Sequence, residues 1–208
     1  MFSALVTIAC LLASANVRAA SSNFTCADVA SGYLVLGTIS ESSNTERLKP
    51  LGPLDQSDTP YISYDSSPPP LFTLESCNST YMGFPPNMTW QEGYLVVYGR
   101  WKLNGKCVTV GGDGALALKT CATADGKALV NQFFDTTFDA PTGSVSDQAE
   151  TQLIGYTTND TSLAMYTTVT RHSKTEVVSQ TETPPSNDGG SEHRILFYPD
   201  TASGDLPF

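Results

Sequence analysis

Hydrophobic and polar residues alternate in short runs along this chain, which predicts strands rather than helices. The clearest run alternates Leu116 and Leu118 with Ala117 and Lys119, as in a half-buried strand. Similar runs are rich in Val, Tyr, Thr and Phe and are bounded by Gly, Pro, Asn and Asp. The expected strands are residues 33–39, 61–64, 71–75, 94–103, 107–110, 116–120, 132–136, 151–157, 162–170, 175–180 and 195–198. So many short strands indicate an all-β fold, either a barrel or a sandwich.

Two sequence markers recur in the same order along the chain. The tetrapeptide Gly-Tyr-Leu-Val begins at Gly32 and again at Gly93, and a looser copy begins at Leu153. Each copy is followed by a short phenylalanine run, which contains Phe72, Phe134 and Phe197 respectively. The order predicts three repeats of roughly 60 residues, with these phenylalanines at equivalent inward-facing positions. The alternative is a chance match among common strand residues.

The first residues form a separate segment. An apolar stretch over residues 4–15 runs into Val17-Arg18-Ala19, which is typical of a secretory signal peptide and its cleavage site. We expect residues 1–19 to be a signal peptide and residues 20–208 to form one domain. Later segments fall short of the roughly 18 apolar residues of a membrane helix. The sequence therefore predicts a secreted, extracellular protein that does not insert into membranes.

Four cysteines remain after the signal peptide: Cys26, Cys77, Cys107 and Cys121. They allow three pairings. The short span from Cys107 to Cys121 favours a local disulfide, which leaves Cys26 to pair with Cys77. A zinc site is disfavoured, because the sequence lacks a Cys-x-x-Cys pair and secreted thiols usually form disulfides. We expect no metal or other cofactor.

Four N-glycosylation sequons support the secretory interpretation. They begin at Asn23, Asn78, Asn87 and Asn159. Each motif is weak alone, but together with a signal peptide and paired cysteines they predict a glycoprotein of a eukaryotic secretory pathway. The four asparagines are then expected on exposed turns.

The charge balance restricts the partners. The chain has 11 basic and 21 acidic residues and a formal net charge of −10. Such a balance disfavours nucleic acid, whose phosphates would be repelled, and anionic membrane surfaces. A glycan or an extracellular protein is the expected partner.

Sequence motifs of enzymes are missing. The chain has no nucleophile elbow, no metal-spaced histidine pair and no phosphate-binding loop. The glycine-rich segment 111–114 precedes a strand, which predicts a hairpin turn rather than a dinucleotide site. His172 and His193 lie in polar stretches, and we expect both to be exposed and to have no catalytic role. The sequence therefore predicts a protein that is not an enzyme.

One segment resembles a known family. Cys107-Val108-Thr109-Val110, the alternating run ending in Cys121, and Gln132-x-Phe134 together resemble one repeat of a ricin B-type β-trefoil. The whole chain also resembles small secreted proteins of mushroom-forming fungi to which no activity is assigned. The resemblance implies an all-β trefoil, with three four-stranded units that form a six-stranded barrel capped by three hairpins. Fold alone does not give function, because trefoils serve as lectins, protease inhibitors, growth factors and scaffolds.

The family's sugar site predicts where a ligand would bind. It uses an Asp two residues after the first Cys of a repeat, with an aromatic ring and an amide nearby. Thr109 stands at the Asp position of the best-matched repeat, so that repeat is expected to lack the site. Cys26-Ala27-Asp28-Val29 has the expected order, with Tyr33 close by. Asp28 and Tyr33 are therefore the candidate ligand-binding residues, although an Asp before a strand is more often a turn residue.

Two tryptophans offer other stacking surfaces. Trp101 continues a predicted strand and is expected in the core, whereas Trp90 stays open as a candidate. We expect a secreted, lectin-like, carbohydrate-binding protein. The alternatives are a trefoil protease inhibitor, using proline-rich segments 66–70 or 183–190 as rigid loops, and a structural extracellular or cell-wall protein without a small-ligand site.

Overall fold

The computed structural model describes residues 24–40, 45–54, 60–64, 66–84, 89–91, 93–138, 148–155, 166–172, 175–181 and 192–200. Within them every regular element is a strand except one turn of 3-10 helix, η1 (Lys127–Leu129). The strands are β1 (Cys26–Ser40), β2 (Thr45–Pro53), β3 (Ile62–Tyr64), β4 (Phe72–Cys77), β5 (Thr89–Gln91), β6 (Tyr94–Leu103), β7 (Lys106–Val110), β8 (Leu116–Thr120), β9 (Phe134–Phe138), β10 (Ala149–Leu153), β11 (Tyr166–His172), β12 (Thr175–Thr181) and β13 (Glu192–Pro199). The expected all-β fold is confirmed.

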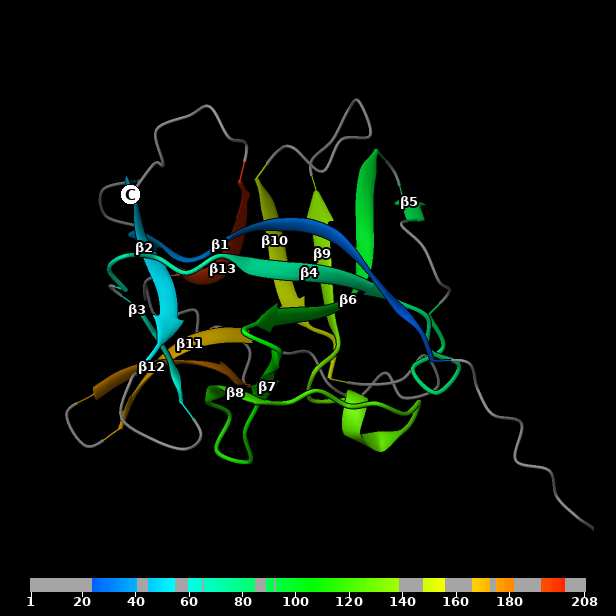
Figure 1. The fold of residues 1–208 in the computed structure, drawn as a ribbon. Coiled ribbons are helices and arrows are strands. Elements are labelled where there is room, and N and C mark those ends of the chain that lie inside the picture. The colour runs from blue at the N-terminus through cyan, green and yellow to red at the C-terminus, as the bar shows by residue number, and fades with distance from the viewer. Residues whose placement is uncertain are drawn as a thin grey trace, which may run out of the picture.

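Six strands close into an antiparallel barrel. Around the ring, β1 pairs with β4, β4 with β6, β6 with β9, β9 with β10, β10 with β13, and β13 with β1 again. Closure leaves no free edge in this ring, so its backbone groups are paired on both sides. Figure 1 shows the long strands β1 and β4 running side by side across the barrel.

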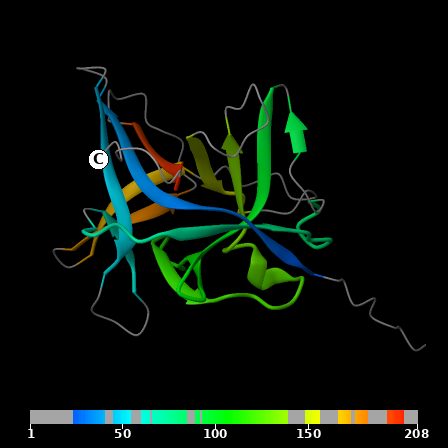
Figure 2. The same ribbon diagram turned by 45° about the horizontal axis from the view of Figure 1, so that its top comes forward.

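Three antiparallel hairpins interrupt the order of the barrel strands. Hairpin β2–β3 lies between β1 and β4 in the chain, β7–β8 between β6 and β9, and β11–β12 between β10 and β13. In both ribbon views, β7–β8 and η1 lie on the same side of β4 (Figures 1 and 2). Each pair of barrel strands within a third of the chain is thus joined through a hairpin.

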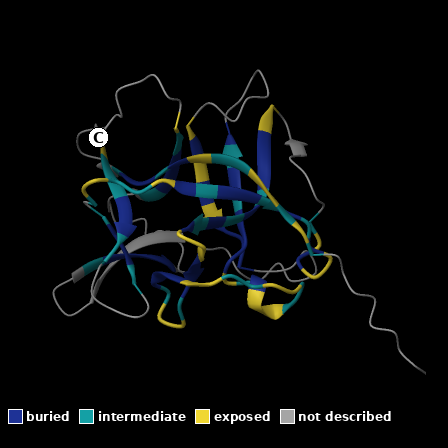
Figure 3. Ribbon diagram, viewed as in Figure 1, coloured by how far each residue is buried: buried dark blue, intermediate teal, exposed yellow. Residues whose placement is uncertain are grey.

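The barrel is filled by large apolar side chains from all six of its strands. Phe72, Phe134 and Phe197 are at most 1% exposed, and Trp101 is fully buried. The rings of Trp101 and Phe197 lie 4.7 Å apart between centroids, and Phe138 meets Phe197 edge to face. Figure 3 shows the buried residues along the barrel strands, with exposed ones at η1 and at the β7–β8 turn. The prediction that the three marker phenylalanines face inward is confirmed.

The phenylalanine markers and the tetrapeptide markers differ in register. Phe72 lies opposite Gly32 of β1, but Phe134 lies opposite Gly99 rather than Gly93. The residue opposite Phe197 in β10 is Ala149, not Leu153. The copies of Gly-Tyr-Leu-Val therefore do not mark equivalent positions. A small residue opposite each phenylalanine is what recurs.

Close packing explains two of these small residues. A Cβ atom added to Gly32 would overlap the ring of Phe197 and the carbonyl oxygen of Tyr198. A Cβ atom added to Gly99 would overlap the carbonyl oxygen of Glu75. Neither position has room for a side chain, because strand backbones and ring edges approach closely there.

Two strands were absent from the sequence-based prediction, and others were displaced by a few residues. β2 reads Thr-Glu-Arg-Leu-Lys-Pro-Leu-Gly-Pro, and such charged and proline-containing runs disfavour strands locally. It forms because β1 supplies a long antiparallel ladder beside it. The three-residue β5 is held similarly by β6. The strand expected at 151–157 is β10, which already ends at Leu153.

Several predictions concern residues outside the described ranges. These are the signal peptide at 1–19, the sequons at Asn23, Asn87 and Asn159, and the segment 183–190. Over the ranges that are described, the chain contains no helix with the length and apolar character of a membrane span.

Candidate functional site

The two disulfides join the expected cysteines. Cys26 at the start of β1 is bonded to Cys77 at the end of β4, and Cys107 of β7 to Cys121 just after β8. The first bond ties two neighbouring barrel strands together, and the second closes a hairpin. Both predicted pairings are confirmed.

Asp28 and Thr109, which were compared with the same position of the family motif, lie at different places in the fold. Thr109 lies on β7, a hairpin strand, whereas Asp28 lies on β1, a barrel strand. The two Cys-x-x-Val segments thus occupy different parts of the fold. Asp28 must therefore be assessed from its own surroundings rather than from the family motif.

Thr109 is occupied by internal hydrogen bonds. Its hydroxyl donates to the carbonyl oxygen of Cys107 at 3.0 Å and accepts from Gln132 Nε2 at 2.9 Å. The same amide nitrogen of Gln132 donates to the carbonyl oxygen of Thr120, and its Oε1 accepts from Ala122 N at 2.9 Å. Thr109 is only 6% exposed. These bonds fix the β7–β8 hairpin and leave Thr109 unsuited to a ligand.

Asp28 belongs to a row of polar residues on the outer wall of the barrel. It lies opposite Glu75 of β4, which lies opposite Arg100 of β6. The next row joins Ser31, Thr73 and Lys102 across the same strands. Directly opposite residues share one face of a sheet, and Leu74 and Trp101 beside them point into the core. We call Asp28, Ser31, Thr73, Glu75, Arg100 and Lys102 the outer strip.

Ion pairs organise the outer strip around Glu75. One carboxylate oxygen of Glu75 accepts from Arg100 Nε and the other from Lys102 Nζ, both at 2.5 Å. Arg100 also donates to the carbonyl oxygen of Ala122 at 2.8 Å. Burial alone would raise the pKa of Glu75, but the hydrogen bonds from Lys102 and Arg100 hold that pKa below its ordinary value. Glu75 is thus a fixed anion that orients two cations.

Asp28 is the solvent-exposed member at the edge of this ion-pair network. Its side chain is 70% exposed, and its Oδ1 lies 3.9 Å from Lys102 Nζ. A register shift of the β1–β4 ladder lies between Asp28 and Ala30, so Val29 is an extra residue there. Such a bulge re-aims the neighbouring side chains. The strip therefore presents a carboxylate and an ammonium group to solvent, side by side.

Tyr33 is on the same strand as Asp28 but in a different neighbourhood. It lies opposite Tyr198 of β13, and both rings are half-buried. About four strand steps separate Asp28 from Tyr33, or roughly 13 Å. Ser31 lies between them on the outer face. Asp28 and Tyr33 could contact one extended ligand, but they are too far apart to hold one small ring together.

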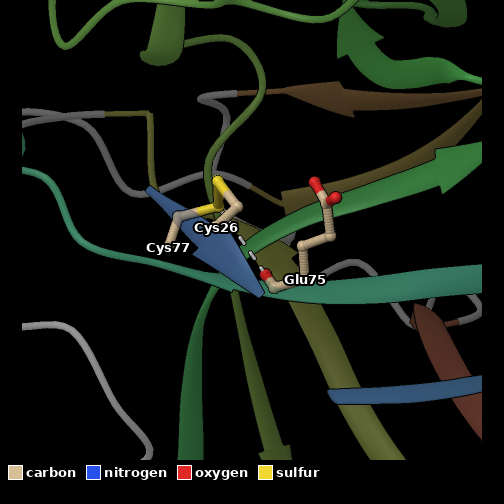
Figure 4. A group of neighbouring side chains, drawn as sticks. All are labelled: Cys26, Glu75 and Cys77. Atoms are coloured by element: carbon tan, nitrogen blue, oxygen red, sulfur yellow. Dashed lines mark hydrogen bonds between the residues drawn. A yellow bond between two sulfur atoms is a disulfide. The ribbon is translucent and has the colours of Figure 1, made fainter. Parts of the chain in front are cut away.

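One group of potential metal ligands is found in the described part of the chain. It consists of Cys26, Glu75 and Cys77, whose ligand atoms lie within 4.8 Å of one another. Figure 4 shows that the two sulfurs are joined as a disulfide. Cys77 Sγ also lies 3.9 Å from the carbonyl oxygen of Glu75. Metals bind thiolates, so these bonded sulfurs do not form a metal site.

The remaining candidates divide between core and surface. Trp101 is in the core as expected, and its Nε1 donates to Thr151 Oγ1 at 2.9 Å. Nothing is described of the side chains of Trp90 and His172. The expectation that His193 is exposed is wrong, because it is half-buried. Its Nδ1 lies 3.0 Å from Thr38 Oγ1 on the neighbouring strand, and burial lowers its pKa.

Sequence reasoning missed Glu75, Arg100 and Lys102. A local signal existed, because each of them alternates with a core residue in its strand: Glu75 with Leu74, and Arg100 and Lys102 with Trp101. The strand pairing that brings the three charges together, however, links residues distant in sequence.

A scan against protein-family models and a search of curated proteins found no match to this chain.

Proposed function

We propose that this protein is a secreted β-trefoil that binds carbohydrate and has no catalytic activity. The trefoil assignment is supported by the closed six-stranded barrel and by the hairpin inserted in each third of the chain. The recurrent pairing of a core phenylalanine with a small residue also supports it. Two disulfides favour an oxidising compartment and hence secretion.

One observation carries the binding proposal: the exposed pairing of Asp28 with Lys102 on the outer strip. A carboxylate accepts hydrogen bonds from hydroxyl groups, and an ammonium group donates them. The hydroxyls of Ser31 and Thr73 lie in the next row of the same wall. A sugar presents many hydroxyls at fixed spacing, so this mixture of donors and acceptors suits it. Tyr33 and Tyr198 extend the surface with ring faces that suit the apolar side of a sugar.

The protease-inhibitor alternative receives less support. Its candidate loop at 66–70 is fastened to β2 by a hydrogen bond from Ser66 N to the carbonyl oxygen of Pro50 at 3.1 Å. Ser67 and Pro68 are exposed, whereas Pro69 and Pro70 are only partly exposed. An inhibitory loop has to project into a protease cleft, and this segment is instead tied at Ser66 to the hairpin strand β2.

The test is a glycan array probed with the mature protein after removal of its own N-glycans. Binding to at least one glycan class is expected. Asp28→Asn preserves the shape but removes the charge, and should weaken binding by about 1.5–3 kcal/mol, the value of a charged hydrogen bond. The matched control is Glu150→Gln, which neutralises an exposed carboxylate on β10.

The outcomes separate the three functions. Loss of binding in Asp28→Asn but not in Glu150→Gln supports the proposed site. Equal affinities in all three proteins would move the site away from Asp28. A wild-type protein that binds no glycan would overturn carbohydrate binding, and the inhibitor or structural functions would then take precedence.

A further inference from the structure

The distance between Lys102 and Asp28 is the feature of the outer strip that best indicates which ligand group would fit there. Lys102 Nζ already donates to Glu75 at 2.5 Å, which leaves two of its three N–H groups for other acceptors. Asp28 Oδ1 lies 3.9 Å from the same nitrogen. That separation is too long for a direct hydrogen bond.

One hydroxyl oxygen can bridge these two groups. An N–H···O bond of about 2.9 Å and an O–H···O bond of about 2.7 Å, meeting at about a right angle, span nearly this distance. The hydroxyl would accept from the ammonium group and donate to the carboxylate, so both of its hydrogen-bonding roles are used. Polar groups separated by more than about 3.5 Å are commonly bridged by water in this way. A ligand hydroxyl that replaces such a water keeps both bonds.

Both groups can be reached from solvent, and Lys102 is held in place. The side chain of Lys102 is 29% exposed and that of Asp28 is 70% exposed. Glu75, which is 7% exposed and also paired with Arg100, anchors Lys102 from the buried side. Preorganisation of this kind lowers the entropy cost of binding.

We propose that a ligand hydroxyl bridges Lys102 Nζ and Asp28 Oδ1, and that the ligand is a neutral sugar. This inference rests on the proposed carbohydrate function. The site then spans β1, β4 and β6. It is therefore formed by strands from the first and the second third of the chain, rather than by strands from one third alone. The strip holds two carboxylates and two cations, so its charges balance and it offers no unpaired charge to an acidic or a basic sugar.

The experiment measures affinity for defined probes by calorimetry. The neutral probes are lactose, cellobiose and chitobiose, and the charged probes are sialyllactose and the disaccharide of glucosamine. The variants are Lys102→Met, Lys102→Arg, Asp28→Asn and the double variant Lys102→Met with Asp28→Asn. Lys127→Met, at an exposed position on η1, is the control. Urea unfolding of each variant establishes that it is folded at the temperature of the measurement.

The proposal expects wild type to bind at least one neutral probe more tightly than the charged ones. Lys102→Met should lose about tenfold in affinity, the lower range for a charged hydrogen bond. Lys102→Arg should recover part of that loss, and the double variant should lose less than the product of the two single losses. A deoxy analogue lacking the bridging hydroxyl should bind wild type and Lys102→Met equally.

Three results would overturn the inference, each in a different way. If wild type binds a neutral probe and Lys102→Met binds it equally well, the carbohydrate function stands and the bridge is wrong. If wild type binds only charged probes, the ligand class is wrong. If it binds none of the probes and no glycan on the array, the proposed function fails, and the bridge with it.

Discussion

Gln132 Nε2 donates a hydrogen bond to the hydroxyl of Thr109 at 2.9 Å, across the base of the β7–β8 hairpin. Both residues belong to the segment that resembles a ricin B-type repeat. In this chain the pair fastens a hairpin to the barrel instead of preparing a ligand site. The residues that resemble the family's repeat thus have a structural role in this chain.

This role predicts that Gln132 contributes strongly to stability. Gln132→Ala removes three side-chain hydrogen bonds, one of them to the buried hydroxyl of Thr109. The unfolding free energy should fall by about 2–4 kcal/mol, as measured by urea denaturation. Asn131→Ala at the exposed neighbouring position should change it by less than about 0.5 kcal/mol. Similar small losses in both variants would contradict the structural role.

The three marker phenylalanines should contribute similar amounts to the free energy of unfolding. Replacing Phe72, Phe134 or Phe197 with Ala empties a fully buried site and should cost about 3–5 kcal/mol each. Tyr94→Ala, at a position 47% exposed, provides the matched aromatic control. Losses below about 1 kcal/mol at two of the three core sites would refute a threefold barrel core.

The two disulfides should differ in the stability they provide. Cys26–Cys77 has a sequence separation of 51 and Cys107–Cys121 one of 14. Because a longer loop loses more entropy on closure, replacing the first pair with Ala should cost about 4 kcal/mol and the second about 3 kcal/mol. Denaturation of the two double variants checks the order. A larger loss for the 107–121 pair would show that chain entropy does not dominate.

Asp135 should make the protein more stable in mild acid. It lies on β9 opposite Gln152, and burial, with a further contribution from Glu150, raises its pKa from 3.8 to about 6, against a hydrogen bond from Gln152. The folded state therefore holds this proton more tightly than the unfolded chain. The stabilisation is complete below about pH 4 and is lost as the pH rises through about 6, a change of about 2–3 kcal/mol.

Asp135→Asn isolates that contribution. Glu75 acts in the opposite direction, because its lowered pKa gives stability that is lost as the pH falls. The quantity to measure is therefore the difference in unfolding free energy between wild type and Asp135→Asn at pH 4, 5, 6 and 7. We expect this difference to grow in favour of the variant as the pH rises. A difference independent of pH would contradict a raised pKa.

Asn78 is the sequon that the described structure makes testable. Its Oδ1 accepts a hydrogen bond from Thr25 N at 2.6 Å, which leaves Nδ2, the atom that carries an N-glycan, outside that bond. Thr80→Ala removes the sequon, while the bond from the Thr80 backbone nitrogen to Asp125 can persist. Mass spectrometry of secreted protein should show a glycan at Asn78 in wild type and none in Thr80→Ala. An unmodified Asn78 in wild type would contradict the prediction.

Of the two charged groups at the centre of the candidate site, only Asp28 could be predicted from the sequence. Asp28 was identified from its order after Cys26, although the structure places that segment on a barrel strand rather than on a hairpin. Lys102 could not be found in this way, because the contact between them depends on β1, β4 and β6 being neighbours. Strand pairing over such distances is set by closure of the whole barrel, which no local pattern encodes.

The sequence by itself determined the all-β class, because alternating apolar and polar residues are a local property of the chain. It also indicated the disulfide pairing, through the short span from Cys107 to Cys121, and the burial of Phe72, Phe134 and Phe197. Only the tertiary structure decided the register, in which Gly99 rather than Gly93 lies opposite Phe134. It alone formed β2 from a segment with weak strand preference and brought Asp28 beside Lys102. Both outcomes depend on which strands become neighbours, because pairing and packing energies outweigh the preferences of single residues.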